Sequence, residues 1–392
     1  MVKNSKSAKS QFKKSPRIRS TRNTRRSQKN NITQITLKTS NDSSNKIKRN
    51  SKNIKNTNTN TNKITYENIK IFPNFHSSTL IYMKIMNNKK YFLTASDYHL
   101  IIYSLETMKK ISTATNFYNP WTHCLEMTTG EIVCLNLNNV IFYKYDNYTK
   151  HIIEVKNLIY QTPKFSKGLY QIDGRTIAVC KEKEIYLLDT HNYNVKNTIK
   201  LHYDCKSCLF VDYKETLLMM SENKIEIIDL LLKENIGKIY DAGIGLKKGL
   251  NLENNKILIH NFQGIKIYDS NTFKKLHSIV IKEGISIVKK LNFNNNLIAI
   301  GDSNGGLKFI DYNCNLIYDV NLSKVGINCL FCLTDNKILF NINGGRIVLF
   351  DVEKKSSIYV KKVEGANALR KGFLLDDGTL ILGYCKSFVL LK

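Results

Sequence analysis

One short pattern recurs along most of this chain, and its spacing is nearly constant. The clearest copy covers residues 297–311, with the sequence LIAIGDSNGGLKFID. Apolar residues crowd residues 297–300 and resume at Leu307, as in two strands that are buried on both faces. The Asn-Gly-Gly segment between them tolerates positive φ angles, which a tight turn requires. This copy predicts a strand, a turn and a second strand that ends at Asp311.

The weaker copies can be counted at the apolar residue that ends each second strand. Eight such anchor residues occur: Tyr103, Tyr143, Leu188, Ile228, Tyr268, Ile310, Phe350 and Leu391. Successive anchors lie 40 to 45 residues apart, and the mean of about 41 is typical of a four-stranded propeller blade. A Lys-Gly pair at residues 167–168, 248–249 and 371–372 keeps the same phase. The period therefore predicts a ring of small, similar sheets.

The repeat resembles that of WD-repeat β-propellers. In that family a unit ends with an apolar strand, a turn of the Ser-x-Asp-Gly kind, a second strand and Trp-Asp. Here residues 304–305 are Asn-Gly at the Asp-Gly positions, and residues 310–311 are Ile-Asp at the Trp-Asp positions. Asp follows five of the eight anchors, at Asp189, Asp229, Asp269, Asp311 and Asp351. The resemblance implies an all-β fold, a closed β-propeller of four-stranded blades, and a role as an interaction scaffold.

The anchor count favours eight blades, with seven as the alternative because seven is the commoner number in the resembling family. The last unit, residues 369–391, has room for only three strands. Residues 65–72, TYENIKIF, read as a strand that precedes the first unit. We expect this strand to become the outer strand of the last blade, because closure removes free sheet edges. The predicted domains are a basic tail, residues 1–63, and a propeller, residues 64–392.

Very little helix is expected, because no long segment shows an apolar spacing of 3.6 residues. The predicted core includes residues of the inner and middle strands: Ile298, Leu307, Phe309, Ile338, Leu339, Ile347 and Leu349. No run approaches eighteen apolar residues, so we expect no transmembrane helix. The first residues lack the apolar core of a signal peptide, and the nine cysteines are odd in number. These features favour reduced thiols and a nuclear or cytoplasmic location.

The net charge of +28 is concentrated in the tail, where residues 1–63 hold 18 Lys and Arg against the single acid Asp42, a net of +17. So few apolar residues predict disorder. The densest block spans residues 13–29, with candidate residues Lys13, Lys14, Arg17, Arg19, Arg22, Arg25 and Arg26. Three roles fit it: binding of RNA or DNA phosphates, nuclear import, and a solvated tail without a specific partner.

Residues 116–121, with the sequence NFYNPW, contain the only Trp of the chain. They fall between the first and second units, where a propeller loop lies on one rim of the ring. Phe117, Tyr118 and Trp121 are candidate partner-binding residues, since aromatic side chains dominate binding hot spots. The alternative is that Phe117 and Trp121 pack between blades.

Neither metal nor cofactor binding is predicted. His202, Cys205 and Cys208 have the spacing of zinc ligands, but no second ligand pair stands near them. Cys329 and Cys332 fall in a predicted strand, where residues three apart point to opposite faces.

Catalysis is not predicted either, because none of the eight His residues lies in a Gly-x-Ser-x-Gly or His-Glu-x-x-His context. The sequence predicts a non-catalytic protein–protein scaffold that is monomeric within a multi-subunit assembly. Two alternatives stay open: a nucleic-acid or ribonucleoprotein component anchored by the tail, and an enzyme with its site in the central channel.

Overall fold

The computed structural model describes residues 69–72, 76, 78–116, 119–159, 166–211, 214–240, 242–291, 296–333, 336–342, 346–362, 369–384 and 387–391. The chain divides into two compact units, Met1–Asn62 and Lys63–Lys392. The first unit lies outside the described residues, and so does the predicted disorder of residues 1–63. Among the residues described, no helix has the length and apolarity needed to cross a membrane.

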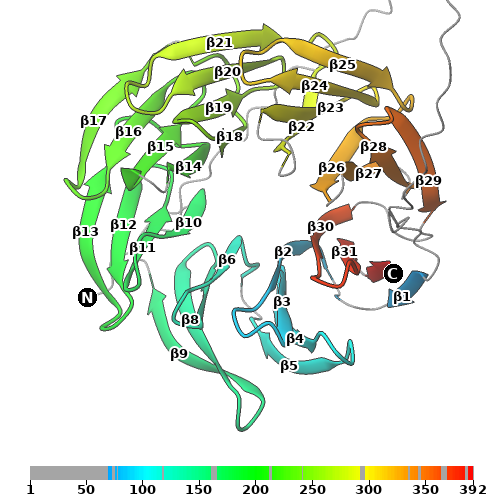
Figure 1. Ribbon diagram of the computed structural model, residues 1–392. Helices are drawn as coiled ribbons and strands as arrows, with labels where there is room; N and C mark the ends of the chain where they lie inside the picture. The colour runs from blue at the N-terminus through cyan, green and yellow to red at the C-terminus, as the bar shows by residue number, and fades with distance from the viewer. Residues whose placement is uncertain are drawn as a thin grey trace, which may run out of the picture. The chain divides into compact units, whose positions relative to one another are not determined.

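The described part of the chain forms eight four-stranded antiparallel sheets, arranged as the blades of a ring (Figure 1). Blade 1 holds β2 (Leu80–Ile85), β3 (Tyr91–Ser96), β4 (His99–Ser104) and β5 (Lys110–Thr115). Blade 2 holds β6 (His123–Glu126), β7 (Glu131–Leu135), β8 (Asn139–Asp146) and β9 (His151–Ile159). Blade 3 holds β10 (Gly168–Gln171), β11 (Thr176–Cys180), β12 (Glu184–Asp189) and β13 (Asn194–Lys200). Blade 4 holds β14 (Ser207–Val211), β15 (Thr216–Met220), β16 (Ile225–Asp229) and β17 (Glu234–Ile239).

The second half of the ring repeats this plan. Blade 5 holds β18 (Lys248–Asn251), β19 (Lys256–His260), β20 (Gly264–Asp269) and β21 (Lys275–Val280). Blade 6 holds β22 (Ile285–Lys290), β23 (Leu297–Asp302), β24 (Gly306–Asp311) and β25 (Leu316–Asn321). Blade 7 holds β26 (Ile327–Cys332), β27 (Lys337–Ile342), β28 (Arg346–Asp351) and β29 (Ser356–Lys362). Blade 8 holds β30 (Leu369–Leu374), β31 (Leu380–Tyr384), β32 (Phe388–Leu391) and β1 (Ile69–Phe72).

The eight-blade prediction is confirmed, and the seven-blade alternative is wrong. The predicted closure is also confirmed, because β1 pairs antiparallel with β32, from Ile69 opposite Leu391 to Phe72 opposite Phe388. Of the predicted strand 65–72, residues 65–68 lie outside the described residues. The rings of Phe72 and Phe388 stack with centroids 4.4 Å apart, and Phe388 also meets Phe92 of blade 1 edge-on at 5.9 Å. Aromatic packing therefore joins the last blade to the first.

The core follows the repeat. All eight anchor residues are buried, and so are the seven predicted core residues. The Lys-Gly phase has a steric cause on the inner strands. A Cβ atom added at Gly249 in β18 would lie 2.6 Å from the Leu209 side chain on the inner strand of blade 4. The glycine lets adjacent inner strands approach closely.

The ring has two rims, because the strand direction alternates within each blade. The connections from first to second and from third to fourth strand, such as residues 172–175 and 190–193, share one rim, which we call the aspartate rim. The connections from second to third strand and between blades, such as residues 261–263 and 201–206, share the other, which we call the lysine rim. The first strand of each blade is innermost and the fourth is outermost (Figure 1).

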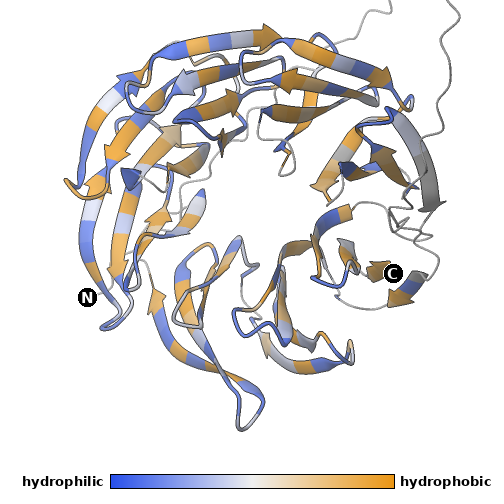
Figure 2. Cartoon of the chain, in the orientation of Figure 1, coloured by the Kyte–Doolittle hydropathy of each residue, from blue (hydrophilic) through white to orange (hydrophobic). Residues whose placement is uncertain are grey.

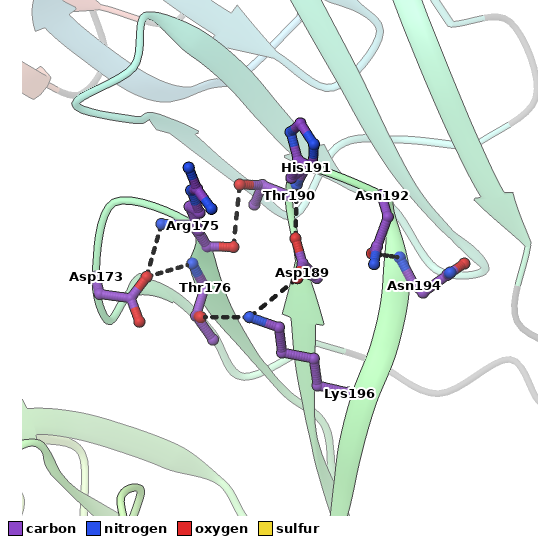
Figure 3. A network of polar contacts seen from close by, with 9 residues as sticks. All are labelled: Asp173, Arg175, Thr176, Asp189, Thr190, His191, Asn192, Asn194 and Lys196. Carbon is purple, nitrogen blue, oxygen red and sulfur yellow. Dashed lines mark hydrogen bonds and ion pairs between the residues drawn. The ribbon is translucent and has the colours of Figure 1, made fainter.

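The Asp residues after the anchors hold the turns of the aspartate rim. Figure 3 shows blade 3, where the carboxylate of Asp189 accepts the backbone N–H of His191 at 2.8 Å and contacts Lys196 Nζ at 3.0 Å. In the neighbouring turn, Asp173 accepts the N–H groups of Arg175 and Thr176 at 2.6 and 2.7 Å. These bonds satisfy amides that the turn removes from the sheet.

The same device recurs around the ring. Four other aspartates accept N–H groups two to four residues further on: Asp229, Asp269, Asp311 and Asp351. Blade 1 has Ser104 at this position, and its hydroxyl accepts the N–H of Thr107 at 3.1 Å. Blade 2 has Lys144 there, and Asp146 accepts the N–H of Tyr148 at 2.8 Å instead. Two of the three units that lack the Asp therefore keep a turn acceptor by other means; in the third, the anchor Leu391 is followed by Lys392.

Candidate binding site

Three lysines lie on the inner strands of three blades and influence one another electrostatically. We call Lys248, Lys289 and Lys371 the inner lysines; they belong to β18, β22 and β30 of blades 5, 6 and 8. Lys248 pairs in register with His260, and Lys371 with Gly383, at equivalent positions near the lysine rim. Among the described residues, no carboxylate forms an ion pair with any of the three. Within the described part of the ring, their charges are therefore uncompensated.

Each inner lysine lies in the electrostatic field of the others. Desolvation within the ring lowers the pKa of Lys248, and the ammonium groups of Lys289 and Lys371 lower it further. The pKa of Lys371 is lowered by the same desolvation and by Lys289. Lys248 and Lys371 still contact water, so protein surrounds these side chains without covering them. Such a cluster repels further cations and attracts anions.

Two histidines lie in the electrostatic field of these lysines. Burial lowers the pKa of His260 to about 4, and Lys247 and Lys248 also act in that direction. Burial lowers the pKa of His123 in β6, with Lys371 adding to the effect. Both rings are thus held neutral beside the lysines at ordinary pH.

An aromatic surface lies on the lysine rim of blades 4 and 5. We call Tyr203, Tyr240 and Phe262 the aromatic patch. Lys224 Nζ lies 4.3 Å from the ring centroid of Tyr203 and 5.8 Å from that of Tyr240. Lys247 Nζ lies 4.7 Å from the ring centroid of Phe262. Lysines therefore cover faces of aromatic rings that remain partly exposed to solvent.

The sequence signal for the inner lysines was the Lys-Gly pair, because Lys248 and Lys371 each precede such a glycine. The recurrence of the Lys-Gly pair indicates a requirement of blade geometry. Close packing of the inner strands explains the glycines of these pairs, but it does not explain the lysines. The lysine of the third pair, Lys167, contacts Glu182 at 3.3 Å. Nothing in the repeat distinguishes a paired lysine from an unpaired one.

Trp121 is buried, with only 2% of its surface exposed. Its ring meets Tyr143 edge-on at 6.1 Å, within the cluster shared by blades 1 and 2. This is the packing predicted as the alternative, and it leaves Trp121 unavailable as an exposed anchor. Phe117 and Tyr118 lie outside the described residues, so partner binding by this segment stays a prediction.

The seven basic candidates of the tail lie outside the described residues as well: Lys13, Lys14, Arg17, Arg19, Arg22, Arg25 and Arg26. Their roles stay predictions.

The cysteines considered as metal ligands lie in the core. Cys205 and Cys208 belong to the cluster between blades 3 and 4. Cys329 packs toward blade 8 and Cys332 toward blades 6 and 7, so the prediction that they point to opposite faces is confirmed. Within the described ranges, no three His, Cys, Asp or Glu side chains are grouped as metal ligands.

A groove of about 1060 Å³ opens on the aspartate rim between blades 1 and 8. Its walls include the apolar side chains of Met86, Leu105 and Leu375. Lys89 and Asp376 form an ion pair at 3.7 Å across the same joint, and both side chains are exposed. A groove of this size is within reach of a small ligand or of a partner loop.

The sequence matches no protein-family model, and no curated protein is a significant match. The fold is similar to solved structures. Sqt1 of Saccharomyces cerevisiae, a WD-repeat protein, has a TM-score of 0.69 and 11% identity, over 82% of this chain and 97% of that chain. The computationally designed Ika8 protein has a TM-score of 0.66 and 11% identity, over 81% of this chain and 97% of that one. These likenesses establish the propeller fold, and function has to be argued from the surface.

Proposed function

We propose that this chain is a divergent WD-repeat-like propeller that acts as a non-catalytic scaffold and recruits other proteins into an assembly. One observation carries the proposal: large apolar side chains are exposed on outer strands of the ring and in an adjoining turn of the aspartate rim. Leu231 and Leu232, in the turn after β16, are 69% and 64% exposed. Ile236 in the adjoining outer strand β17 is exposed too. Three apolar side chains of one blade therefore face solvent together.

The neighbouring blades share this feature. Val280 in β21 and Leu316 and Ile317 in β25 are exposed, and Figure 2 shows apolar positions along these outer strands. Among the described strands, each outer strand pairs with a neighbouring strand on one side only, so its other edge has no strand partner. Scattered exposed apolar residues are ordinary, but grouped ones beside an open strand edge are typical of protein-binding surfaces. The fold likeness to a WD-repeat protein supports the same role by analogy.

Affinity purification of the tagged full-length chain from its native cell tests the proposal. The variant Leu231→Ser/Leu232→Ser should lose specific partners that the wild type retains after nuclease treatment. The matched control Lys233→Gln/Glu234→Gln, in the same segment, should keep them. Recovery of identical proteins with both variants, or of none that resist nuclease, would count against a scaffold that works through this surface.

A second candidate function rests on the charge of +17 in residues 1–63. In it, the chain is a nucleic-acid or ribonucleoprotein component of the nucleus or cytoplasm, anchored by residues 13–29. It predicts nucleic-acid binding that weakens steeply with salt and vanishes when the basic residues of that block are replaced by Gln. Undiminished binding after the replacement would refute a role for the tail.

A further inference from the structure

The aromatic patch is continuous with the inner lysines. Gly245 donates its N–H to Glu222 O at 2.8 Å, and Asn261 Nδ2 donates to Ile244 O at 3.0 Å. The loop between blades 4 and 5 is therefore fastened to the rim turns of both blades. It ends at Lys247, over the Phe262 ring, and the next residue is the inner lysine Lys248. A path of aromatic side chains and lysine ammonium groups thus runs from the lysine rim toward the centre of the propeller.

This surface keeps an excess of positive charge. Five lysines lie along it, and none of them forms an ion pair with a carboxylate of the described residues: Lys206, Lys224, Lys238, Lys247 and Lys248. The described acids nearby offset little of this charge. Asp204 is paired with Lys183 at 3.4 Å, and buried Glu226 accepts the N–H groups of His202 and Tyr203. Glu222 alone is an exposed acid on the same turn as Lys224.

The rings are placed to receive flat groups. Tyr240 is 62% and Phe262 is 48% exposed. Lysine ammonium groups lie over these aromatic rings. A ligand with both planar rings and closely spaced anions would take over both sets of contacts, since each lysine could turn from a ring to an anion. An acidic peptide supplies the anions alone, and a base-paired duplex keeps its base faces covered.

We propose that the lysine rim over blades 4 and 5, continuing to the inner lysines, binds single-stranded nucleic acid. Bases stack on Tyr240, Phe262 and Tyr203, and the phosphates lie against Lys224, Lys247 and the inner lysines. This combination of stacking platforms and a basic path is how single strands are bound without sequence preference. The site is distinct from the exposed apolar residues of the proposed scaffold, such as Leu231 and Leu232, and from the basic tail.

Fluorescence anisotropy with the full-length chain tests the inference. The probes are labelled oligouridylate and oligothymidylate of about twelve nucleotides, which fits the length that such surfaces cover. All variants are made in a background in which the seven basic candidates of the tail are Gln, so that binding by the tail does not obscure the rim. Equal affinity for the two probes would indicate recognition without the 2′-hydroxyl, and tighter RNA binding would indicate contacts to it.

The variant Tyr240→Ala/Phe262→Ala should weaken binding by roughly five- to a hundredfold per stacked base. Lys248→Gln/Lys371→Gln should weaken it and reduce the slope of log affinity against log salt by about 1.4, as expected for two lost phosphate contacts on a single strand. The matched control Lys233→Gln/Lys274→Gln, on the aspartate rim, should leave affinity and slope unchanged.

Two results would overturn the inference. One is loss of all binding when only the tail residues are neutralised, which would assign nucleic-acid binding to the tail. The other is a labelled oligoglutamate that binds as tightly as the oligonucleotides and is indifferent to the aromatic variant, which would assign the rim to an acidic protein segment. Neither result bears on partner capture through Leu231 and Leu232, so the scaffold proposal is tested separately.

Discussion

Folding has opposite effects on the charged groups of the two rims: it favours the charged forms on the aspartate rim and disfavours them on the lysine rim. On the aspartate rim, hydrogen bonds from the turn amides lower the pKa of Asp189 and Asp269, so folding favours the charged forms that exist at neutral pH. On the lysine rim, burial and neighbouring cations lower the pKa of Lys248, Lys371 and His260. Folding there disfavours the protonated forms.

This difference distinguishes charged groups that stabilise the fold from charged groups that are candidates for ligand binding. Groups whose charge stabilises the fold need no further explanation, whereas a cluster whose charges oppose folding is typical of a site that binds something of opposite sign. The lysine rim is not uniform, because Lys308 contacts Asp319 at 2.7 Å and Asp302 at 3.6 Å. That compensated lysine shows what the inner lysines lack.

The largest effect is expected at the closure that holds both rims together. Replacing Phe388 by Ala removes a fully buried ring that contacts Phe72, Phe92 and Tyr103, and should lower the free energy of unfolding by about 3–5 kcal/mol. Urea unfolding followed by circular dichroism measures it. The control Phe262→Ala removes a half-exposed ring and should cost far less. Equal losses for the two would mean that the joint between blades 1 and 8 does not limit stability.

The histidine of the lysine rim and the aspartates of the aspartate rim should change the stability of the fold over different pH ranges. The pKa of His260 is about 4 in the folded ring against 6.5 when unfolded, so the unfolded chain binds the extra proton between these values. Stability should therefore fall as the pH drops from 6.5 toward 4, by up to about 1.4 kcal/mol per pH unit for this residue. The aspartates, whose pKa is lowered from 3.8, keep their contribution until the pH falls below that range.

Thermal melts across this range check the assignment. The variant His260→Gln should flatten the loss between pH 6.5 and 4, while replacement of the exposed His151 by Gln should leave it intact. An unchanged slope in His260→Gln would show that the lysine rim does not set the acid sensitivity.

A smaller effect is expected at the aspartate rim. The carboxylate of Asp311 accepts the N–H groups of Asn313 and Asn315, each at 2.8 Å. Asp311→Ala should destabilise the ring by about 1–2 kcal/mol, because two turn amides lose their acceptor. Asp376→Ala serves as the control, since its ion pair with Lys89 is exposed and exposed pairs contribute about 0–1 kcal/mol. A melting temperature for Asp311→Ala equal to that of the control would contradict the role assigned to the repeated Asp.

The variant Lys248→Met/Lys371→Met is expected to have the smallest effect on stability. It also contrasts most with Asp311→Ala, because removal of charge from the lysine rim should not destabilise the fold. Removing charges that repel one another should leave the free energy of unfolding at pH 7 unchanged or slightly higher. Any gain should shrink as the pH rises through the lysine range, where the wild-type amines also lose their protons. Denaturant unfolding at pH 7 and near pH 10 measures this; a clear loss of stability at pH 7 would show that these lysines are structural.

The sequence by itself determined the blade count, the closure and the buried anchors. These features repeat at a fixed period. In each copy, apolar runs predict the two strands, and Gly, Asn or Asp residues predict the turn between them. The glycines and turn acceptors act within one blade or against the next, so a single unit already contains the reason for its form. Ser104 in blade 1 and Asp146 in blade 2 depart from the Asp repeat, yet each accepts a backbone N–H in the turn between the third and fourth strands.

Only the tertiary structure decided where the unpaired charge lies. Lys248, Lys289 and Lys371 are separated by up to 123 residues, and they become neighbours because closure brings the inner strands of blades 5, 6 and 8 around one centre. The burial of Trp121 and the placement of lysines over Tyr203 and Phe262 likewise depend on contacts between blades. A period in the sequence specifies each blade, but which side chains meet across the ring follows from its closure in three dimensions.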